Sequence, residues 1–221
     1  MDTREMMAES RIERKKRETR QKIVKIAMDL FHSQGFDNTT MEQIAEKTDI
    51  ARKTLYNYFP VKEAIVDEYV RGVSQELAKE NFKTIQDLAD TKSRLLAALN
   101  HSYDWVEKNP EITAICINYR LGSMGKEPGF QSAETGTQSI LKKVIKLGQE
   151  EGEIKPDVSI ELLVRHIDLL RSTMTFEWLN DPSKFELHEE ISKLVDLFLY
   201  GAASKVDSSK KSDISKGGCL R

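Results

Sequence analysis

Residues 37–59 read DNTTMEQIAEKTDIARKTLYNYF, and their pattern predicts the structure of the N-terminal region. Thr40 is followed three residues later by Gln43, which is the spacing of a capping box, so a helix is predicted to begin directly after Thr40. The helical pattern breaks at residues 48–49, and a second short helix is predicted from about residue 51 to residue 57. Two short helices joined by a tight turn form a helix-turn-helix unit.

Apolar residues recur with helical spacing in nearly every other segment of the chain. The stripe between residues 23 and 31 belongs to a helix that is predicted to end at Gly35, and further stripes follow as far as residue 198. No segment alternates apolar and polar residues over the length of a strand. The sequence therefore predicts an all-α fold of about nine helices, with three short ones before Pro60 and six longer ones after it.

The composition is that of a globular protein rather than a disordered, fibrous or membrane one. The chain has 221 residues, of which 39% are hydrophobic and 32% are charged, and its formal net charge is −2. The two cysteines, Cys116 and Cys219, are too few for a disulfide scaffold, and no apolar run approaches the roughly 20 residues of a membrane span. Because no signal peptide is apparent, we expect a cytoplasmic location and no membrane partner.

The charge is distributed unevenly along the chain. Residues 1–60 contain 12 Lys and Arg against 10 Asp and Glu, whereas residues 61–221 contain 22 against 26. The excess is concentrated between residues 11 and 25, where eight basic side chains face only two acidic ones. A basic leading segment on an acidic body indicates a polyanion partner, although such a segment is also typical of a solvated helix start.

The second helix of the helix-turn-helix unit carries side chains that can contact DNA bases and phosphates. A helix of this size fits the major groove and presents the side chains of its N-terminal turn to base edges, and here these are Arg52, Lys53 and Thr54. Arg and Lys can donate to guanine, and the methyl group of Thr can contact thymine. Tyr56 and Tyr58 can reach the phosphate backbone, unless one of the two rings packs into the small core instead.

Residues 39–65 resemble the DNA-binding signature of the tetracycline-repressor (TetR) family of bacterial regulators. The family pattern of a Thr, an Ile-Ala pair, a turn, a short helix, Leu-Tyr-x-His/Tyr-Phe and a Lys-Glu pair is present in register. The resemblance implies a homodimer that reads a palindromic operator in double-stranded DNA, and a C-terminal domain that binds a small-molecule effector. It also implies phosphate contacts for Thr40, Tyr56, Tyr58 and Lys62, and base contacts for Arg52 and Lys53.

Two positions depart from the family pattern. Thr48-Asp49 stands in the turn where Ala-Gly is usual, and Asp tolerates the left-handed conformation better than most residues. The carboxylate of Asp49 also places a negative charge near phosphates. Val61 replaces the usual capping residue before Lys62, which is expected to cost the next helix about 1 kcal/mol.

The resemblance divides the chain into three parts. Residues 1–60 are expected to form a basic arm and the helix-turn-helix domain, and residues 61–203 a helical domain for ligand binding and dimerisation. Residues 204–221 are rich in Lys, Ser and Asp and contain almost nothing apolar, so a disordered tail is expected there.

No constellation of catalytic or metal-ligating residues is apparent in the sequence. The four histidines, His32, His101, His166 and His188, are scattered and lack the spacing of a metal site, so no metal and no cofactor are expected. Cys116 lies in an apolar run and is interpreted as a small core residue rather than a redox sensor. An enzyme is therefore not expected.

The last two helices are predicted to form the contact between two copies of the chain. The helix expected at residues 157–180 has two apolar stripes, and a helix that is apolar on two sides must be covered on both. The next helix has a heptad-like seam that includes Ile191, Leu194 and Phe198, which suggests a four-helix contact around a two-fold axis. The alternative is a thick core within one chain.

An effector pocket is predicted inside the C-terminal domain. The helix expected at residues 157–180 mixes apolar and polar groups on one stripe, which includes His166, Leu170 and Thr173. Segments expected to face this stripe bear Tyr103, Trp105, Cys116 and Tyr119, although aromatic residues at helical spacing also fill ordinary cores. The mixture indicates a largely apolar effector.

Together these features predict a sequence-specific transcriptional regulator, most simply a dimeric repressor under the control of a small molecule. The alternative is a helical interaction protein, or a small-molecule-binding protein, that keeps this fold without binding an operator. The Thr48-Asp49 turn favours the alternative, whereas Arg52 and Lys53 favour DNA binding.

Overall fold

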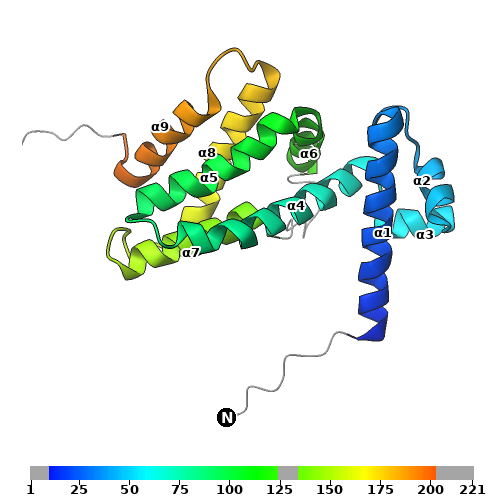
Figure 1. Cartoon of the computed structure of the whole chain (residues 1–221), viewed down its shortest axis with the longest axis horizontal. Coiled ribbons are helices and arrows are strands. Elements are labelled where there is room, and N and C mark those ends of the chain that lie inside the picture. The colour runs from blue at the N-terminus through cyan, green and yellow to red at the C-terminus, as the bar shows by residue number, and fades with distance from the viewer. Residues whose placement is uncertain (1–9, 124–133, 203–221) are drawn as a thin grey trace, which may run out of the picture.

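The computed structural model describes residues 10–123 and 134–202, and within these ranges the chain forms nine helices and no strand (Figure 1). In chain order the helices are α1 (Arg11–Gln34), α2 (Met41–Thr48), α3 (Arg52–Tyr58), α4 (Lys62–Ile85), α5 (Thr91–Lys108), α6 (Pro110–Ser123), α7 (Gly136–Glu150), α8 (Ile160–Asn180) and α9 (Leu187–Tyr200). The predicted all-α fold is confirmed. The tail predicted at residues 204–221 lies outside the described residues.

Helix α1 begins earlier and runs longer than the sequence suggested. The hydroxyl of Ser10 accepts a hydrogen bond from the N–H of Glu13, and the Glu13 carboxylate accepts one from the N–H of Ser10. This capping box starts the helix at Arg11 and gives it 24 residues, so the expectation of three short helices before Pro60 is wrong for the first of them. The basic leading segment is therefore helical and largely exposed, and Gly35 ends the helix with φ 88°.

The turn between α2 and α3 forms without a glycine. Asp49 adopts φ 57° and ψ 49°, and it is the one non-glycine residue with positive φ in residues 10–123 and 134–202. Its N–H donates to the carbonyl oxygens of Ala45 and Glu46, and the ammonium of Lys22 in α1 donates to the carbonyl oxygen of Thr48 at 2.8 Å. Asp49 thus ends α2 in the left-handed conformation, at the position where the family pattern has glycine.

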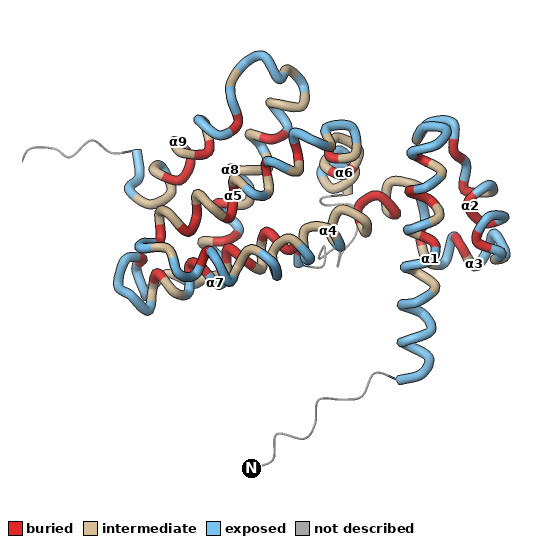
Figure 2. The backbone as a smooth tube through the Cα atoms, in the orientation of Figure 1, coloured by how far each residue is buried: buried red, intermediate tan, exposed pale blue. Residues whose placement is uncertain are grey.

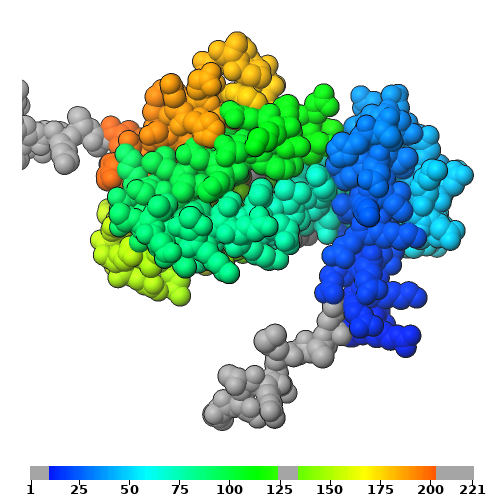
Figure 3. Space-filling model, in the orientation of Figure 1, coloured from blue at the N-terminus to red at the C-terminus, as the bar shows by residue number. Residues whose placement is uncertain are grey.

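The first three helices and the start of α4 form a small lobe, here called the head, which stands at one end of the larger body (Figure 3). Its core contains Ile23, Ile44, Leu55 and Phe59, which are at most 1% exposed. Leu55 and Phe59 therefore both point into this core. Helix α4 leads from this lobe into the body, and α2 and α3 lie on the side of α1 that faces away from the body (Figure 1).

Two helices that extend beyond residue 60, α4 and α6, contribute to the core of the head. Ile65 and Val66 of α4, and Cys116 of α6, belong to the apolar cluster of the head. The rest of the buried residues of α5, α7, α8 and α9 form a second cluster in the body (Figure 2). The core of the head therefore continues past residue 60 and includes a helix that lies about 50 residues further along the chain.

Helix α8 buries one of its two apolar stripes and leaves the other uncovered. Val164 and Ile167 are buried in the body, whereas Leu162, Leu169 and Phe176 are 38%, 55% and 38% exposed. The two-sided apolar character predicted for this helix is therefore present, and a single chain covers one side of it.

Helix α9 differs from the prediction because its seam faces the chain's own body. Ile191 and Leu194 are buried against α5, and Phe198 packs on the same cluster. Apolar side chains of α9 that do remain exposed are Leu197 and Tyr200. The surface left for a second copy is therefore not the Ile191 and Leu194 seam. None of the helices in the described part of the chain is both long enough and apolar enough to cross a membrane.

Candidate DNA-binding head and effector cavity

The N-terminal turn of α3 is open to solvent, while the opposite face of the helix fixes it to the head. Arg52 and Lys53 are exposed and Thr54 is half-buried, whereas Leu55 is fully buried. The guanidinium of Arg52 lies 3.8 Å from Glu42 of α2, in a pair that is too exposed to hold the side chain in place. All three predicted base-contacting side chains are therefore available on one turn of a well-anchored helix.

The residues predicted to contact phosphates differ in how far they also pack within the head. Thr40 caps α2 and is exposed, and Tyr56 is 46% exposed. Tyr58 is half-buried against the apolar cluster of the head, so it is the tyrosine that takes part in packing. The ammonium of Lys62 donates to the carbonyl oxygen of Phe36 at 2.7 Å and lies 4.3 Å from the centre of its ring, which also gives Lys62 a structural role.

Arg20 is a residue of the head that sequence reasoning missed. Its Nη1 donates to the carbonyl oxygen of Tyr58 at 3.2 Å, its Nη2 lies 3.1 Å from Glu68, and its guanidinium stacks 4.4 Å from the centre of the Phe59 ring. These contacts join α1 to the C-terminal end of α3 and to α4. Because the partners are 38 and 48 residues away, no local pattern could have identified them.

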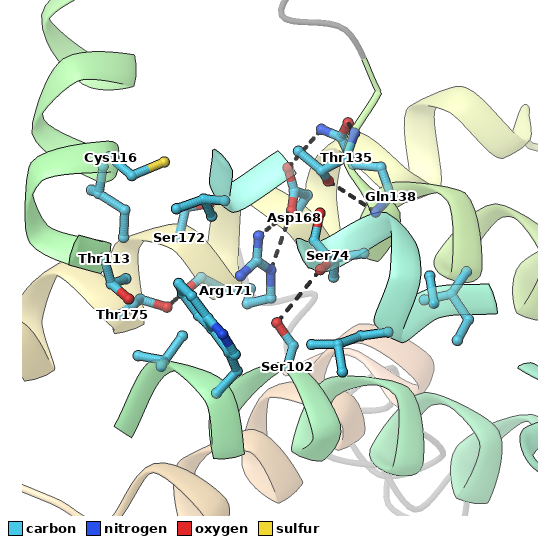
Figure 4. Close-up of a pocket in the computed structure, with 18 of the residues that line it drawn as sticks. Ser74, Ser102, Thr113, Cys116, Thr135, Gln138, Asp168, Arg171, Ser172 and Thr175 are labelled. Carbon is cyan, nitrogen blue, oxygen red and sulfur yellow. Dashed lines mark hydrogen bonds and ion pairs between the residues drawn. The ribbon is translucent and has the colours of Figure 1, made fainter. Parts of the chain in front are cut away.

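The body contains a cavity of about 360 Å³ that is walled by α4, α5, α6, α7 and α8. Its surface is mostly apolar, and Val73, Leu77, Trp105, Val106, Ile117 and Ile140 are among the side chains that line it. Cavities of this size with few polar groups are typical of small-molecule sites. Figure 4 shows the polar side chains, which come from all five helices or their flanks.

Asp168 and Arg171 form a hydrogen-bonded ion pair in the cavity. Arg171 donates to Oδ1 of Asp168 through Nη2 at 2.7 Å, and Gln138 donates to Oδ2 at 2.9 Å (Figure 4). Burial alone would raise the pKa of Asp168, but the charge of Arg171 and the hydrogen bonds from Arg171 and Gln138 together hold that pKa below its ordinary value. Asp168 is therefore an ionised and fully partnered carboxylate.

Of the residues predicted to bind an effector, the structure brings Trp105 and Cys116 to the cavity. Tyr103 lies behind the wall, fully buried, with its hydroxyl donating to the carbonyl oxygen of Arg171 at 3.0 Å. Burial raises the pKa of Tyr103 to about 12, so this hydroxyl keeps its proton. Tyr119 is not among the residues that line the cavity.

The predicted stripe on α8 lies on the wrong side of that helix to line the cavity. His166, Leu170 and Thr173 are exposed, and α8 turns Arg165, Asp168, Ser172 and Thr175 toward the cavity instead. The two stripes are about one residue apart, and a helix that is apolar on two sides does not indicate by its pattern which side faces inward. The opposite charges of Asp168 and Arg171, three residues apart and therefore on one face of the helix, were a signal that could have been used.

One histidine lies closer to acidic groups than the sequence suggested. Ligand atoms of Asp104, Glu107 and His188 all lie within 4.8 Å of one another where α5 meets the start of α9. Nδ1 of His188 is hydrogen-bonded to Asn100 at 2.8 Å. The side chains are between a third and a half exposed, which is common for surface groups that hold no ion.

A helix-turn-helix head with an open recognition helix, joined to a helical body with an internal cavity, defines a DNA-binding regulator rather than an enzyme. The family model described as bacterial regulatory proteins of the tetR family matches residues 23–69, which cover most of the head. Residues 23–69 therefore match the DNA-binding domain of the TetR family, and the chain as a whole is similar to transcriptional regulators.

The chain is similar over most of its length to other helix-turn-helix transcriptional regulators. It is 25% identical over 189 residues to the transcriptional repressor KstR2 of Rhodococcus jostii, covering 84% of this chain and 91% of that protein. It is 24% identical over 197 residues to the uncharacterised regulator YdgC of Bacillus subtilis, covering 85% and 94%. The fold matches the crystal structure of the TetR-family repressor FadR of Thermus thermophilus in complex with lauroyl-CoA, with a TM-score of 0.73, 23% identity and coverage of 86% and 97%.

Proposed function

We propose that the chain is a repressor that binds a palindromic operator as a homodimer in the cytoplasm and leaves it when a small molecule fills the cavity. The observation that carries this proposal is the open N-terminal turn of α3, with Arg52, Lys53 and Thr54 on a helix that Leu55 and Phe59 fix to the head. Such a helix can enter a major groove, where guanidinium and ammonium groups read guanine.

The uncovered stripe of α8 supports the homodimer. Leu162, Leu169, Leu170 and Phe176 of α8 are exposed, together with Leu197 and Tyr200 of α9. Large apolar side chains that are exposed on one helix in this number are costly in water and are typical of interfaces between subunits. A two-fold axis beside α8 would pair this surface with itself and would place two heads on one operator.

The apolar walls of the cavity support an effector with a long hydrocarbon chain. The FadR proteins of Thermus thermophilus and Bacillus subtilis have been crystallised with lauroyl-CoA and stearoyl-CoA, and the second matches this fold with a TM-score of 0.57 at 17% identity. Acyl compounds are therefore the first class to test, and lauroyl-CoA is the first probe. The coupling between effector and operator is expected to be roughly 5–150-fold in DNA affinity.

The experiment that tests the proposal begins with selection of duplexes from a random pool. The wild-type chain should enrich a near-palindrome, and a variant with Arg52→Ala and Lys53→Ala should not. Lys146→Ala, at an exposed site on α7, is the matched control and should enrich the same sequence. Adding lauroyl-CoA should then release the selected duplex in a fluorescence-anisotropy titration. If no palindrome is enriched, the alternative of a binding protein that keeps the fold without an operator is correct.

A further inference from the structure

Five charged side chains form a continuous row from the recognition helix to the cavity, which we call the ion-pair row. It consists of Arg20 of α1, Glu68, Arg71 and Asp67 of α4, and Arg120 of α6. Arg20 lies 3.1 Å from Glu68, Glu68 lies 3.5 Å from Arg71, Arg71 is hydrogen-bonded to Asp67, and Arg120 Nε lies 2.5 Å from Asp67.

The two ends of the ion-pair row touch the two functional parts of the molecule. At one end Arg20 donates to the carbonyl oxygen of Tyr58, the last residue of α3. At the other end Arg120 lines the cavity. Near that end, Cys116 of the same helix both lines the cavity and belongs to the core of the head. A change at Arg120 can therefore reach the recognition helix through groups in direct contact.

The ion-pair row contains one more positive charge than negative charge. Its three arginines face two carboxylates, and Asp67 is only 4% exposed. Among residues 10–123 and 134–202, Nη2 of Arg120 and Nε of Arg71 are buried and have no hydrogen-bond partner. Buried donors of charged groups are normally paired, so within the described residues Nη2 of Arg120 is a donor at the cavity end that can bind a further anion.

No neighbouring group of the described chain supplies that anion. The thiol of Cys116 lies 3.6 Å from Asp67, but burial raises the pKa of Cys116 to about 12, so the thiol is neutral. Asp168 lines the cavity and its charge interacts with that of Arg120, but its oxygens are already bound by Arg171 and Gln138. The missing charge is therefore one that a molecule in the cavity can bring.

We propose that the effector has a carboxylate head group that binds Arg120, and that the ion-pair row transmits this event to α3. The proposal rests on the effector cavity of the proposed function and adds the head group and the route. A carboxylate that binds the unpaired Nη2 of Arg120 weakens the attraction between Arg120 and Asp67, so Asp67 interacts more strongly with Arg71. The ion pair between Glu68 and Arg20 then changes, and so does the hydrogen bond from Arg20 to the carbonyl oxygen of Tyr58. The effector shifts the equilibrium between the DNA-bound and DNA-free forms only to the extent that its affinities for the two forms differ.

The head group is tested by comparing two ligands that share one hydrocarbon chain, dodecanoate and dodecanol. Binding is followed by the fluorescence of Trp105, which lines the cavity. For the wild-type chain we expect dodecanoate to bind at least about tenfold more tightly, since a charge-assisted hydrogen bond is roughly twice as strong as a neutral one. Arg120→Gln should abolish the difference and leave the dodecanol affinity unchanged, which also shows that the variant is folded.

The control for this comparison is Lys79→Gln, which removes one positive charge from an exposed site on α4 and should keep the preference for dodecanoate. Equal affinities of the wild-type chain for the two ligands would overturn the head-group assignment. If lauroyl-CoA releases operator DNA but dodecanoate neither binds nor releases it, the proposed function stands and this inference fails.

The route is tested by Glu68→Gln, which keeps the shape of the side chain and removes the charge between Arg20 and Arg71. The measured quantity is the ratio of the operator Kd values with and without dodecanoate, because the variant can also change DNA affinity itself. We expect the ratio to fall from the wild-type value, about 5–150, to near one, while dodecanoate binding is retained. Glu76→Gln, on the exposed face of α4, should keep the wild-type ratio. An unchanged ratio for Glu68→Gln would exclude the ion-pair row as the route.

Discussion

Gly136 lies so close to the main chain of Ser74 that a methyl group on Gly136 would meet the Ser74 carbonyl oxygen at 1.8 Å. The N–H of Gly136 donates to the hydroxyl of Ser74 at 3.0 Å, so the first residue of α7 is fixed directly against α4. Main-chain atoms cannot move aside as a flexible side chain can. This contact therefore requires glycine at residue 136.

Gly136→Ala is expected to lower the free energy of unfolding by about 1–3 kcal/mol, because α7 must move away from α4 to accommodate the methyl group. Gly72→Ala is the matched control, since Gly72 is helical and has nothing within 4 Å of the added methyl group. It should raise the free energy of unfolding by about 0.5–1 kcal/mol. Urea unfolding at one fixed protein concentration measures both, and equal effects would contradict the close contact.

The pair formed by Asp168 and Arg171 should make stability depend on pH in the acidic range. The pKa of Asp168 is lower in the folded chain than the ordinary value of 3.8, so the ionised form stabilises the folded state at and above pH 4. This contribution is lost as the pH falls through the lowered pKa. Asp168→Asn should cost about 3 kcal/mol at pH 7 and should flatten the pH dependence below pH 4. Glu177→Gln, at an exposed site on α8, should leave that dependence unchanged.

Cys116 should resist alkylation in the folded chain. Burial raises its pKa to about 12, and the thiolate that reacts with iodoacetamide is therefore almost absent at pH 8. In a Cys219→Ser background we expect no modification of the native chain and complete modification in guanidinium chloride, both measured by mass spectrometry. Rapid modification of the native chain would instead show that reagents enter the cavity as far as Cys116.

The surface of α8 predicts the effect of a charge at the interface between two copies. Phe176→Glu should give folded monomers at micromolar concentration, because it places a charge within the exposed apolar stripe. Ile12→Glu changes an exposed apolar residue of α1 and should leave a dimer. Leu194→Arg should unfold the chain rather than dissociate it, since Leu194 is buried in the body. Sedimentation velocity with circular dichroism separates these outcomes, and a monomeric wild-type chain would refute the dimer.

Two lysines of the head should affect DNA binding in different ways. Lys53→Ala is expected to cost about 1–3 kcal/mol on the selected operator and to relax discrimination at one base step. Lys62→Ala should weaken binding to all sequences alike and reduce the salt dependence, and should also lower the Tm because Lys62 holds the Phe36 carbonyl group. A uniform loss for Lys53→Ala would place that side chain on phosphates instead of bases.

Local signals were sufficient to predict the helix-turn-helix unit. The capping box of Thr40 and Gln43 involves residues three apart, and the end of α1 at Gly35 depends on the conformation of one residue. The left-handed turn at Asp49 was also predictable, because the side chain type alone makes it tolerable. Each of these features depends on residues that lie within a few positions of one another, so a single sequence contains the whole signal.

Features that depend on distant segments were not predictable from one sequence. Arg20 was read only as part of a basic leading segment, whereas its partners lie in α3 and α4. The inward side of α8 was misplaced because both of its sides are apolar, and the neighbours that choose between them come from α6 and α7. The seam of α9 was assigned to a second chain, since a heptad-like pattern does not specify which helix will cover it.

The position of Cys116 in the core of the head limits how this regulator can be re-engineered. A chimera that joins residues 1–60 to the body of another regulator would lose the contacts of Ile65, Val66 and Cys116 and leave Phe59 without part of its cover. A graft that keeps α1–α4 must therefore also bring the matching face of α6. For this reason, transplanting the DNA specificity of this chain is better done by exchanging the exposed residues of α3 than by exchanging the whole head.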